Sequence, residues 1–184
     1  FNVLLFSGGS RLMSPSSLPA TGENIARAVS LIDQQQGGGG TELLAAVERA
    51  MALPGDERSR SRSILIITDG YIGAEREVFT TIREHLGEAN VFAFGIGSGV
   101  NRHLIEGLAR AGAGEPFVAL TPEEAPASAA RFREYVQYPL LTHVRVAFEG
   151  FGAYDVQPSS IPDVMAERPI LVIGKWRGRP GGQV

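Results

Sequence analysis

The 184-residue chain is long enough to bury a sizeable core and suits one domain, or one domain with an appendage. Apolar residues make up 43% and charged residues 20%, which is ordinary for a globular protein, and the formal charge of −3 gives no general attraction for nucleic acid. There is no cysteine, which excludes disulfides and thiolate chemistry, and no apolar run approaches the roughly 20 residues of a membrane helix. Phe1 already lies in a predicted strand, so we expect a fragment, with any signal peptide upstream.

The first forty residues predict a strand pair and a helix. Residues 1–6 form a short apolar run, and the turn Ser7-Gly-Gly-Ser10 leads into an antiparallel return strand at 11–13. Thr21 is suited to cap the helix that follows. Four apolar residues at helical spacing predict a face turned to the core: Ile25, Ala28, Val29 and Ile32.

A glycine run, 37–40, ends this helix and allows the backbone to approach a ligand closely, although a flexible linker is the plainer interpretation. Thr41 then opens a second helix, which Pro54-Gly55 stops. Its predicted apolar side consists of Leu43, Leu44, Val47, Ala50 and Met51.

The chain is organised around residues 63–73. Four consecutive aliphatic residues, 64–67, are typical of a strand buried on both faces, as in a parallel sheet. Asp69 comes directly after this strand. Ligands bind at the C-terminal edge of open α/β sheets, so a carboxylate there is a candidate functional group, and the alternative is an Asp that only caps the next turn.

Strands and helices then alternate. We predict a helix at 75–86, a strand at 90–96, a helix capped by Asn101, a strand at 115–120 and a helix from Thr121 to about 136. Pro126 lies deep in this last helix, which favours a later start. The alternation indicates a doubly wound, mainly parallel sheet. We expect 1–6, 64–68 and 91–96 to be parallel strands of one sheet with helices on both faces.

The pattern changes after Tyr138-Pro139. Apolar residues alternate with other residues at 143–148, and a second apolar run spans 169–174, with no helix-length pattern between them. We therefore divide the chain into a domain at 1–138 and a β-rich extension at 139–184, with 141–148 and 170–174 as strands outside the main sheet.

Enzyme motifs are missing. The glycines of Gly95-x-Gly97-x-Gly99 lie between a strand and a helix, but their spacing differs from that of a dinucleotide-binding loop. The sequence also has no phosphate-loop lysine motif and no Gly-x-Ser-x-Gly nucleophile elbow. The three histidines lie on separate elements without ligand spacing and are interpreted as surface residues.

A hard-cation site is the better candidate. Thr41 follows the glycine run and Asp69 ends the central strand, so in a doubly wound sheet both fall on the C-terminal edge. A hydroxyl and a carboxylate are oxygen ligands of the kind that Mg²⁺ prefers. Two separate capping residues are the alternative.

Several segments resemble a von Willebrand factor A (VWA) domain, which has a Rossmann-like fold. They are Gly39-Gly-Thr41-Glu-Leu, Ile64-Leu-Ile-Ile-Thr-Asp69-Gly and Phe94-Gly-Ile-Gly-x-Gly-Val-Asn101-Arg-x-Leu-Ile. Tyr138-Pro-Leu-Leu-Thr-His-Val, Pro158-Ser-Ser-Ile-Pro-Asp163 and Arg168-Pro-Ile-Leu-Val-Ile-Gly174 are similar to the inter-alpha-trypsin inhibitor heavy-chain type and its bacterial relatives.

The resemblance implies a metal-ion-dependent adhesion site in the complete domain. Thr41 and Asp69 match its second and third ligand loops, and Mg²⁺, with Mn²⁺ or Ca²⁺ as alternatives, would be the ion. The first motif, Asp-x-Ser-x-Ser, is missing, so we expect the opening strand and first helix to lie upstream and the fragment itself to hold no metal. The extension would be part of a sandwich completed by segments from before the A domain.

We therefore interpret the chain as a non-enzymatic protein-binding or adhesion module whose partner offers an acidic side chain to the metal, with no nucleic acid involved. The resemblance favours an extracytoplasmic or cell-surface location. The exposed edges of the tail predict self-association. Two rivals remain: a structural scaffold with a degenerate metal site, and a doubly wound hydrolase or nucleotide-binding enzyme.

Overall fold

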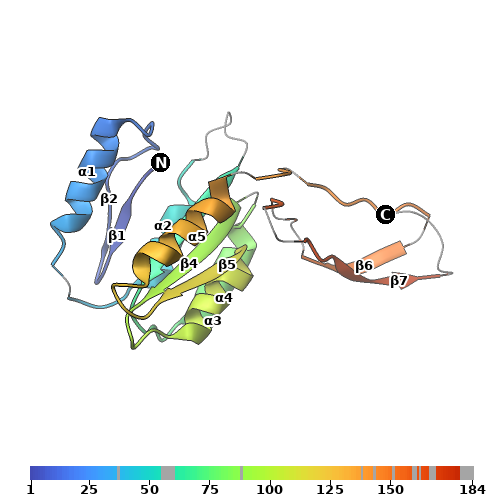
Figure 1. Ribbon diagram of the computed structural model, residues 1–184. Coiled ribbons are helices and arrows are strands. Elements are labelled where there is room, and N and C mark those ends of the chain that lie inside the picture. Colours follow the sequence, from blue (N-terminus) through green and yellow to red (C-terminus); the bar gives the residue numbers. More distant parts are fainter. Residues whose placement is uncertain are drawn as a thin grey trace.

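The computed structural model describes residues 1–36, 38–54, 61–87, 89–137, 139–142, 144–150, 152–158, 161, 163–165 and 169–178. Helices α1 to α5 and the parallel strands make up most of it, and the β6–β7 hairpin stands away from them (Figure 1). In chain order the elements are β1 (Leu4–Phe6), β2 (Ser10–Leu12), α1 (Gly22–Asp33), α2 (Leu43–Met51), β3 (Arg62–Thr68), α3 (Glu75–His85), β4 (Ala89–Ile96), α4 (Arg102–Ala111), β5 (Ala113–Ala119), α5 (Ala125–Gln137), β6 (Gly152–Gln157) and β7 (Ile173–Arg177).

A parallel sheet in the order β3-β4-β5 lies at the centre of the fold. The β3–β4 register is regular, from Arg62 opposite Ala89 to Thr68 opposite Gly95, and the β4–β5 register shifts between Val91 and Ala93. Every residue of β4 except Ile96 is buried. The predicted strands at 64–68, 91–96 and 115–120 and the doubly wound α/β class are thus confirmed. The predicted burial of 64–67 on both faces is wrong, because β3 is an edge strand on which Leu65 and Ile67 are 39% and 49% exposed.

Each face of the sheet has its own apolar core. Helices α2, α3 and α4 cover one face, where aliphatic side chains dominate. Helix α5 covers the other face, where Phe92, Phe94 and Phe117 pack against Phe132 and Tyr135. The fully enclosed residues of the first core include Leu43, Val78, Ile82, Val91, Leu104, Ile105 and Leu108.

The predicted caps of α1 and α4 agree with the structure, whereas α5 begins after the predicted Thr121. The hydroxyl of Thr21 accepts a hydrogen bond from the backbone N–H of Asn24, and the Asn101 side chain accepts one from Leu104. Helix α5 begins at Ala125, which places Pro126 in its first turn, where its missing N–H is tolerated. The later start expected from Pro126 is confirmed.

The prediction that residues 1–6 belong to the same sheet is wrong. Strand β1 pairs antiparallel with β2, as the Ser7–Ser10 turn predicts, but the two form a separate sheet. In the described ranges no strand pairs with the edge of β3 that faces away from β4. An apolar run indicates a strand but does not select the neighbour with which that strand pairs.

The core-facing role predicted for α1 is also wrong. Only Ala28 is buried, while Ile25, Val29 and Ile32 are about half exposed, at 47%, 51% and 52%. The four residues do share one side of a helix, as their spacing predicts. However, α1 lies beside the two-stranded β1–β2 sheet, away from the central sheet (Figure 1), so its apolar stripe is only partly covered by the described chain.

The tail contains an antiparallel hairpin, β6–β7, outside the main sheet. The extra antiparallel strands confirm a β-rich C-terminal region, although β7 begins at Ile173, later than predicted. The strand predicted at 141–148 is wrong: Leu141 makes one isolated bridge with Val164, and 144–148 join no ladder. Residue 143 and the boundary residue Tyr138 lie outside the described residues, so the division at 138/139 stays a prediction.

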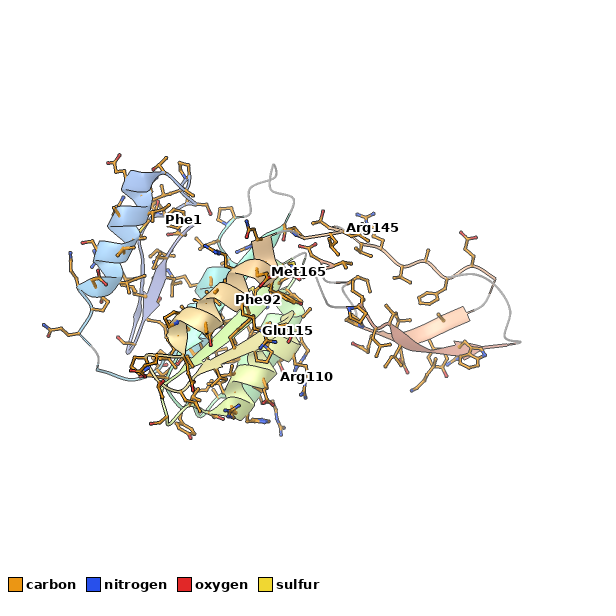
Figure 2. All side chains as sticks on the ribbon, in the orientation of Figure 1. Phe1, Phe92, Arg110, Glu115, Arg145 and Met165 are labelled. Atoms are coloured by element: carbon orange, nitrogen blue, oxygen red, sulfur yellow. The ribbon has the colours of Figure 1, made fainter. Side chains whose placement is uncertain are left out.

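A short segment attaches the tail to the central domain. The Asp163 carboxylate accepts hydrogen bonds from the Ser61 hydroxyl and, at 2.9 Å, from the side-chain amide of Asn90, which is 1% exposed at the start of β4. Met165 is buried in the cluster that contains Phe92, as Figure 2 shows. The apolar contact and the polar contacts together fix 163–165 against the sheet.

Met165→Ala should lower the free energy of unfolding by about 2–4 kcal/mol, because it removes a buried side chain and leaves a cavity among aromatic rings. The matched control is Leu171→Ala, at a site that is 73% exposed, which should change stability by no more than about 0.5 kcal/mol. Urea unfolding followed by circular dichroism measures both. Equal effects of the two substitutions would contradict the packing of the tail on α5.

Candidate metal-binding edge

Asp69 lies where β3 ends, at the C-terminal edge of the sheet. The backbone N–H of Gly70 donates to the hydroxyl of Thr68 at 3.2 Å, which turns the chain immediately after the strand. Asp69 is exposed, and α3 takes its N-cap from Ala74. The carboxylate is therefore not used to cap the next helix.

Thr41 reaches the same turn from the other side. Helix α2 takes its N-cap from Glu42 and has no side-chain capping hydrogen bond, so the Thr41 hydroxyl does not cap it either. A Cβ atom added to Gly70 would lie 2.7 Å from Thr41 Oγ1. The side chain of Thr41 thus packs directly against the residue that follows Asp69, and the structure brings the two predicted site residues to one edge.

Ser7, which we did not predict as a site residue, lies beside this loop. Its carbonyl accepts a hydrogen bond from the backbone N–H of Glu42 at 2.9 Å, and its Cβ would be 3.4 Å from a Cβ added to Gly39. Gly39 has φ +93°, a conformation that favours glycine. The glycine run therefore lets the chain pass close to Ser7. No pattern in the sequence pairs Ser7 with Thr41, because their proximity depends on the placement of β1.

The donors at this edge fit part of a hard-cation site. A threonine hydroxyl and an aspartate carboxylate are both oxygen ligands suited to Mg²⁺. However, the residues that the structure describes contain no group of three or more His, Cys, Asp or Glu that could hold a metal ion. Thr41 and Asp69 could therefore supply only part of a coordination shell, and their assignment as ligands stays a prediction.

The glycines at the end of β4 and in the loop after it allow α4 to pack on the strand. A Cβ atom on Gly95 would lie 2.3 Å from Val100 Cγ2 and 2.8 Å from Ile105 Cγ1, so the absence of a side chain lets α4 approach the strand. Gly97 has φ +93° and makes the turn. This geometry accounts for both glycines without a nucleotide.

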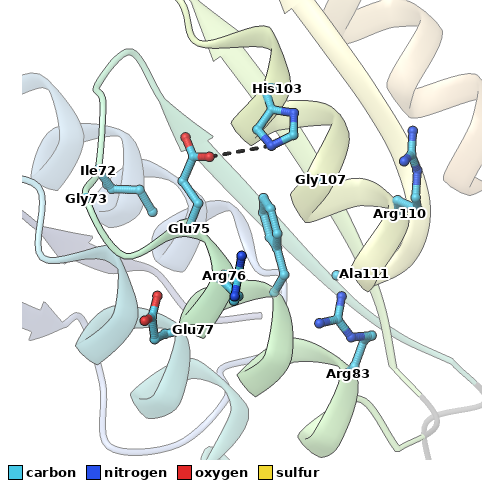
Figure 3. Close-up of a pocket in the computed structure, with 11 residues that line it drawn as sticks. Ile72, Gly73, Glu75, Arg76, Glu77, Arg83, His103, Gly107, Arg110 and Ala111 are labelled. Carbon is cyan, nitrogen blue, oxygen red and sulfur yellow. Dashed lines mark ion pairs between the residues drawn. The ribbon is translucent and has the colours of Figure 1, made fainter.

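A second polar cluster lies close by, between α3 and α4. Asn101 caps α4 through Oδ1 and donates through Nδ2 to Glu75 Oε1 at 2.6 Å. His103 Nε2 lies 3.6 Å from Glu75 Oε2 (Figure 3). The sequence predicted Asn101 only as a cap and His103 only as a surface residue. Their common contact with Glu75 depends on how α3 and α4 pack together, and a local sequence pattern does not predict that packing.

The comparisons with known proteins decide the family. Residues 1–116 match the family model described as the von Willebrand factor type A domain. The chain belongs to this VWA family. The family typically consists of protein-interaction modules. None of the helices in the described part of the chain is long and apolar enough to cross a membrane.

Relatives support the heavy-chain resemblance. The chain is 26% identical over 147 residues to von Willebrand factor A domain-containing protein 5B1 of Homo sapiens, covering 79% of this chain and 12% of that protein. It is 28% identical over 186 residues to inter-alpha-trypsin inhibitor heavy chain H3 of Bos taurus, covering 95% and 21%. The chain thus spans a small part of the curated relatives it matches.

Solved structures share the fold. A von Willebrand factor type A protein from Catenulispora acidiphila superposes with a TM-score of 0.62 at 18% identity, covering 85% of this chain and 38% of that one. The conserved hypothetical protein BatB from Bacteroides thetaiotaomicron gives a TM-score of 0.52 at 16% identity, covering 71% and 75%. These similarities establish the VWA fold for this chain.

A double-mutant cycle tests the contact between Thr41 and the turn after Asp69. Gly70→Ala should destabilise the protein by about 1–3 kcal/mol, because its methyl group would meet the threonine hydroxyl. Thr41→Ala in the same chain should relieve part of this cost, giving a coupling free energy of at least about 0.5 kcal/mol in denaturant unfolding.

Gly73→Ala is the matched control, because a Cβ there would meet nothing within 4 Å. It should show no coupling to Thr41→Ala. Strict additivity of Gly70→Ala and Thr41→Ala would contradict the contact.

Proposed function

We propose that this VWA domain is a protein-binding module whose metal ion, held in part by Thr41 and Asp69, binds an acidic side chain of the partner. The observation that supports the proposal is the contact between Thr41 and Gly70, the residue that follows the exposed Asp69. A divalent ion that is only partly ligated by protein strongly attracts a carboxylate. Mg²⁺ is the proposed ion, and Mn²⁺ or Ca²⁺ would suit the same oxygen donors.

The remaining ligands would come from an Asp-x-Ser-x-Ser motif outside these 184 residues. One carboxylate and one hydroxyl cannot fix the octahedral geometry that Mg²⁺ requires, and Mg²⁺ loses its waters reluctantly. In the complete protein, Asp69 would supply the carboxylate and Thr41 the hydroxyl. In the present chain, Asp69 and Thr41 would present only these two oxygen donors.

Two alternatives belong to other classes. In a scaffold with a degenerate metal site, the parent protein would lack the Asp-x-Ser-x-Ser motif. An enzyme would need a nucleophile with a base or a phosphate-binding loop, and the packing role of Gly95 favours a structural glycine there. The protein-interaction character of the family supports the non-enzymatic proposal.

We also propose an extracytoplasmic or cell-surface location and a bacterial source. Similarity to an inter-alpha-trypsin inhibitor heavy chain supports the location, as does the fold shared with a protein described as an aerotolerance-related membrane protein from Bacteroides fragilis (TM-score 0.51, 18% identity, 72% of this chain and 77% of that one). Three structural neighbours from bacteria are consistent with the source.

Titration calorimetry tests the metal proposal. The 184-residue chain should bind Mg²⁺ weakly or not at all, because its described residues offer too few ligands. The parent protein, with its upstream sequence, should bind Mg²⁺, and Asp69→Ala should abolish that binding. Asp33→Ala, at another exposed carboxylate, is the control and should leave it unchanged. Binding of equal strength by the short chain and the parent would show that no upstream ligands are needed.

The tail supports a further proposal, self-association through β6–β7 between two copies of the chain. All five residues of β7 are exposed, and Leu171, Ile173 and Trp176 are 73%, 62% and 55% exposed. In the described part of the chain these two strands pair only with each other. A two-stranded hairpin is marginally stable in water, and an open edge of this kind recruits another chain.

Light scattering on the chain should show a dimer or larger species that dissociates on dilution. Trp176→Lys should shift the chain to monomer, because a charge replaces the largest exposed apolar side chain of the hairpin. Tyr71→Lys is the control, since Tyr71 is 69% exposed but lies after β3, and it should leave the association unchanged. A monomer at all concentrations for the unmodified chain would contradict the proposal.

A further inference from the structure

A cleft of about 900 Å³ lies between α3 and α4, with the loop after β3 at one end (Figure 3). Its lining includes Ile72 and Gly73, which follow Asp69 by three and four residues, so the cleft begins beside the candidate metal edge. The side chains of the two helices that form its walls take no part in the proposed metal site.

Phe79 contributes an apolar surface to the cleft. Its ring packs against Gly107 of α4, where an added Cβ would lie 2.1 Å from Phe79 Cζ. The ring also meets His103 edge to face, with 6.2 Å between centroids. The two helices thus approach each other through an aromatic ring and a glycine, and the ring stays half-buried at the cleft.

Three arginines border the same cleft: Arg76 and Arg83 from α3, and Arg110 from α4. All three are exposed, and none forms an ion pair with a residue that the structure describes. Arg83 makes one hydrogen bond to the Thr80 hydroxyl at 3.1 Å, which leaves most of its donors available. In a chain of net charge −3, three arginines against two glutamates give the lining of this cleft a formal charge of +1.

Two glutamates, Glu75 and Glu77, also line the cleft and limit the kinds of ligand that it can bind. Glu75 accepts a hydrogen bond from Asn101 and lies against His103, so its oxygens are directed to these residues and not to the arginines. Glu77 is exposed at the rim. Carboxylates at the rim repel a continuous phosphate backbone, whereas a short peptide can place individual carboxylates opposite guanidinium groups, which bind them with two parallel hydrogen bonds.

We propose that this cleft is a second docking site, independent of metal, for an acidic segment of a protein partner that carries an apolar side chain. The arginines would bind carboxylates of the segment, and Phe79 with Ile72 would contact the apolar side chain. The site needs neither Thr41 nor Asp69. It can therefore be tested without reference to the metal.

The test uses the full 184-residue chain, ¹⁵N-labelled and titrated with the acetylated, amidated peptide Glu-Glu-Phe-Glu-Glu. Saturable amide shifts should be confined to α3, α4 and the loop before α3, with a dissociation constant on the order of a millimolar. Replacing Arg76, Arg83 and Arg110 by Gln should weaken binding about tenfold, the combined effect of three weak exposed ion pairs. Added salt should weaken it as well.

A matched control variant distinguishes binding in the cleft from a general attraction of the chain for acidic peptides. Replacing Arg11, Arg133 and Arg145 by Gln removes the same charge from exposed positions outside the cleft and should leave the affinity unchanged. EDTA and Asp69→Ala should also leave the affinity for the peptide unchanged. This separates a test of the cleft from a test of the metal proposal. The proposal would be overturned if the two arginine triple variants lost affinity equally, or if a peptide with Gln in place of Glu bound equally well. Tighter binding of a single-stranded oligonucleotide, or the absence of saturable amide shifts, would overturn it too.

Discussion

Helices cover both faces of β4, and this double burial constrains most of the fold. One face of β4 packs against α3 and α4 through Val91 and Ala93, and the other packs against α5 through Phe92 and Phe94. A strand enclosed in this way favours apolar side chains along most of its length and requires close approach of its neighbours. Gly95 meets the second requirement, because its missing side chain gives Val100 and Ile105 room to pack on the strand. The same packing holds the ends of β3 and β4 in register, so Asp69 leaves the sheet at a defined edge.

The sequence predicted local structure better than the pairing of distant segments. The aliphatic run 64–67 and the helical spacing of 75–86 each identify an element, because a short run of β-prone residues and a helical stripe are patterns in the chain itself. The run did not predict burial, since Leu65 and Ile67 are 39% and 49% exposed. The neighbour of a strand leaves no such pattern. The apolar run at 1–6 therefore predicts a strand but not its sheet, and the apolar stripe of α1 predicts a helix but not its exposure. At 144–148, alternation alone did not produce a strand, because alternation does not determine whether a neighbouring strand is available for a ladder.

The same distinction applies to the two candidate sites. Asp69 and Thr41 could be predicted at one edge of the sheet, because Asp69 ends a parallel strand and Thr41 precedes the helix that leads back into that strand. The cleft between α3 and α4 could not be predicted in this way. Its arginines lie on the solvent-facing sides of two helices, where charged residues are ordinary, and only the contact of Phe79 with Gly107 brings the two helix faces together. Topology therefore pointed to the first site, and tertiary packing was needed to find the second.

The position of the tail has a consequence for access to both sites. Asp163 binds the side chains of Ser61 and Asn90 at the N-terminal ends of β3 and β4, whereas Thr41 meets the turn after β3 at the C-terminal end. The seven residues of β3 separate these ends by roughly 20 Å. The segment that attaches the tail therefore leaves the Asp69 edge open. Because the cleft begins at that same edge, one elongated partner could contact the aspartate and the arginines together. Two weak contacts linked in one ligand bind more tightly than either alone, since the second forms at a raised effective concentration.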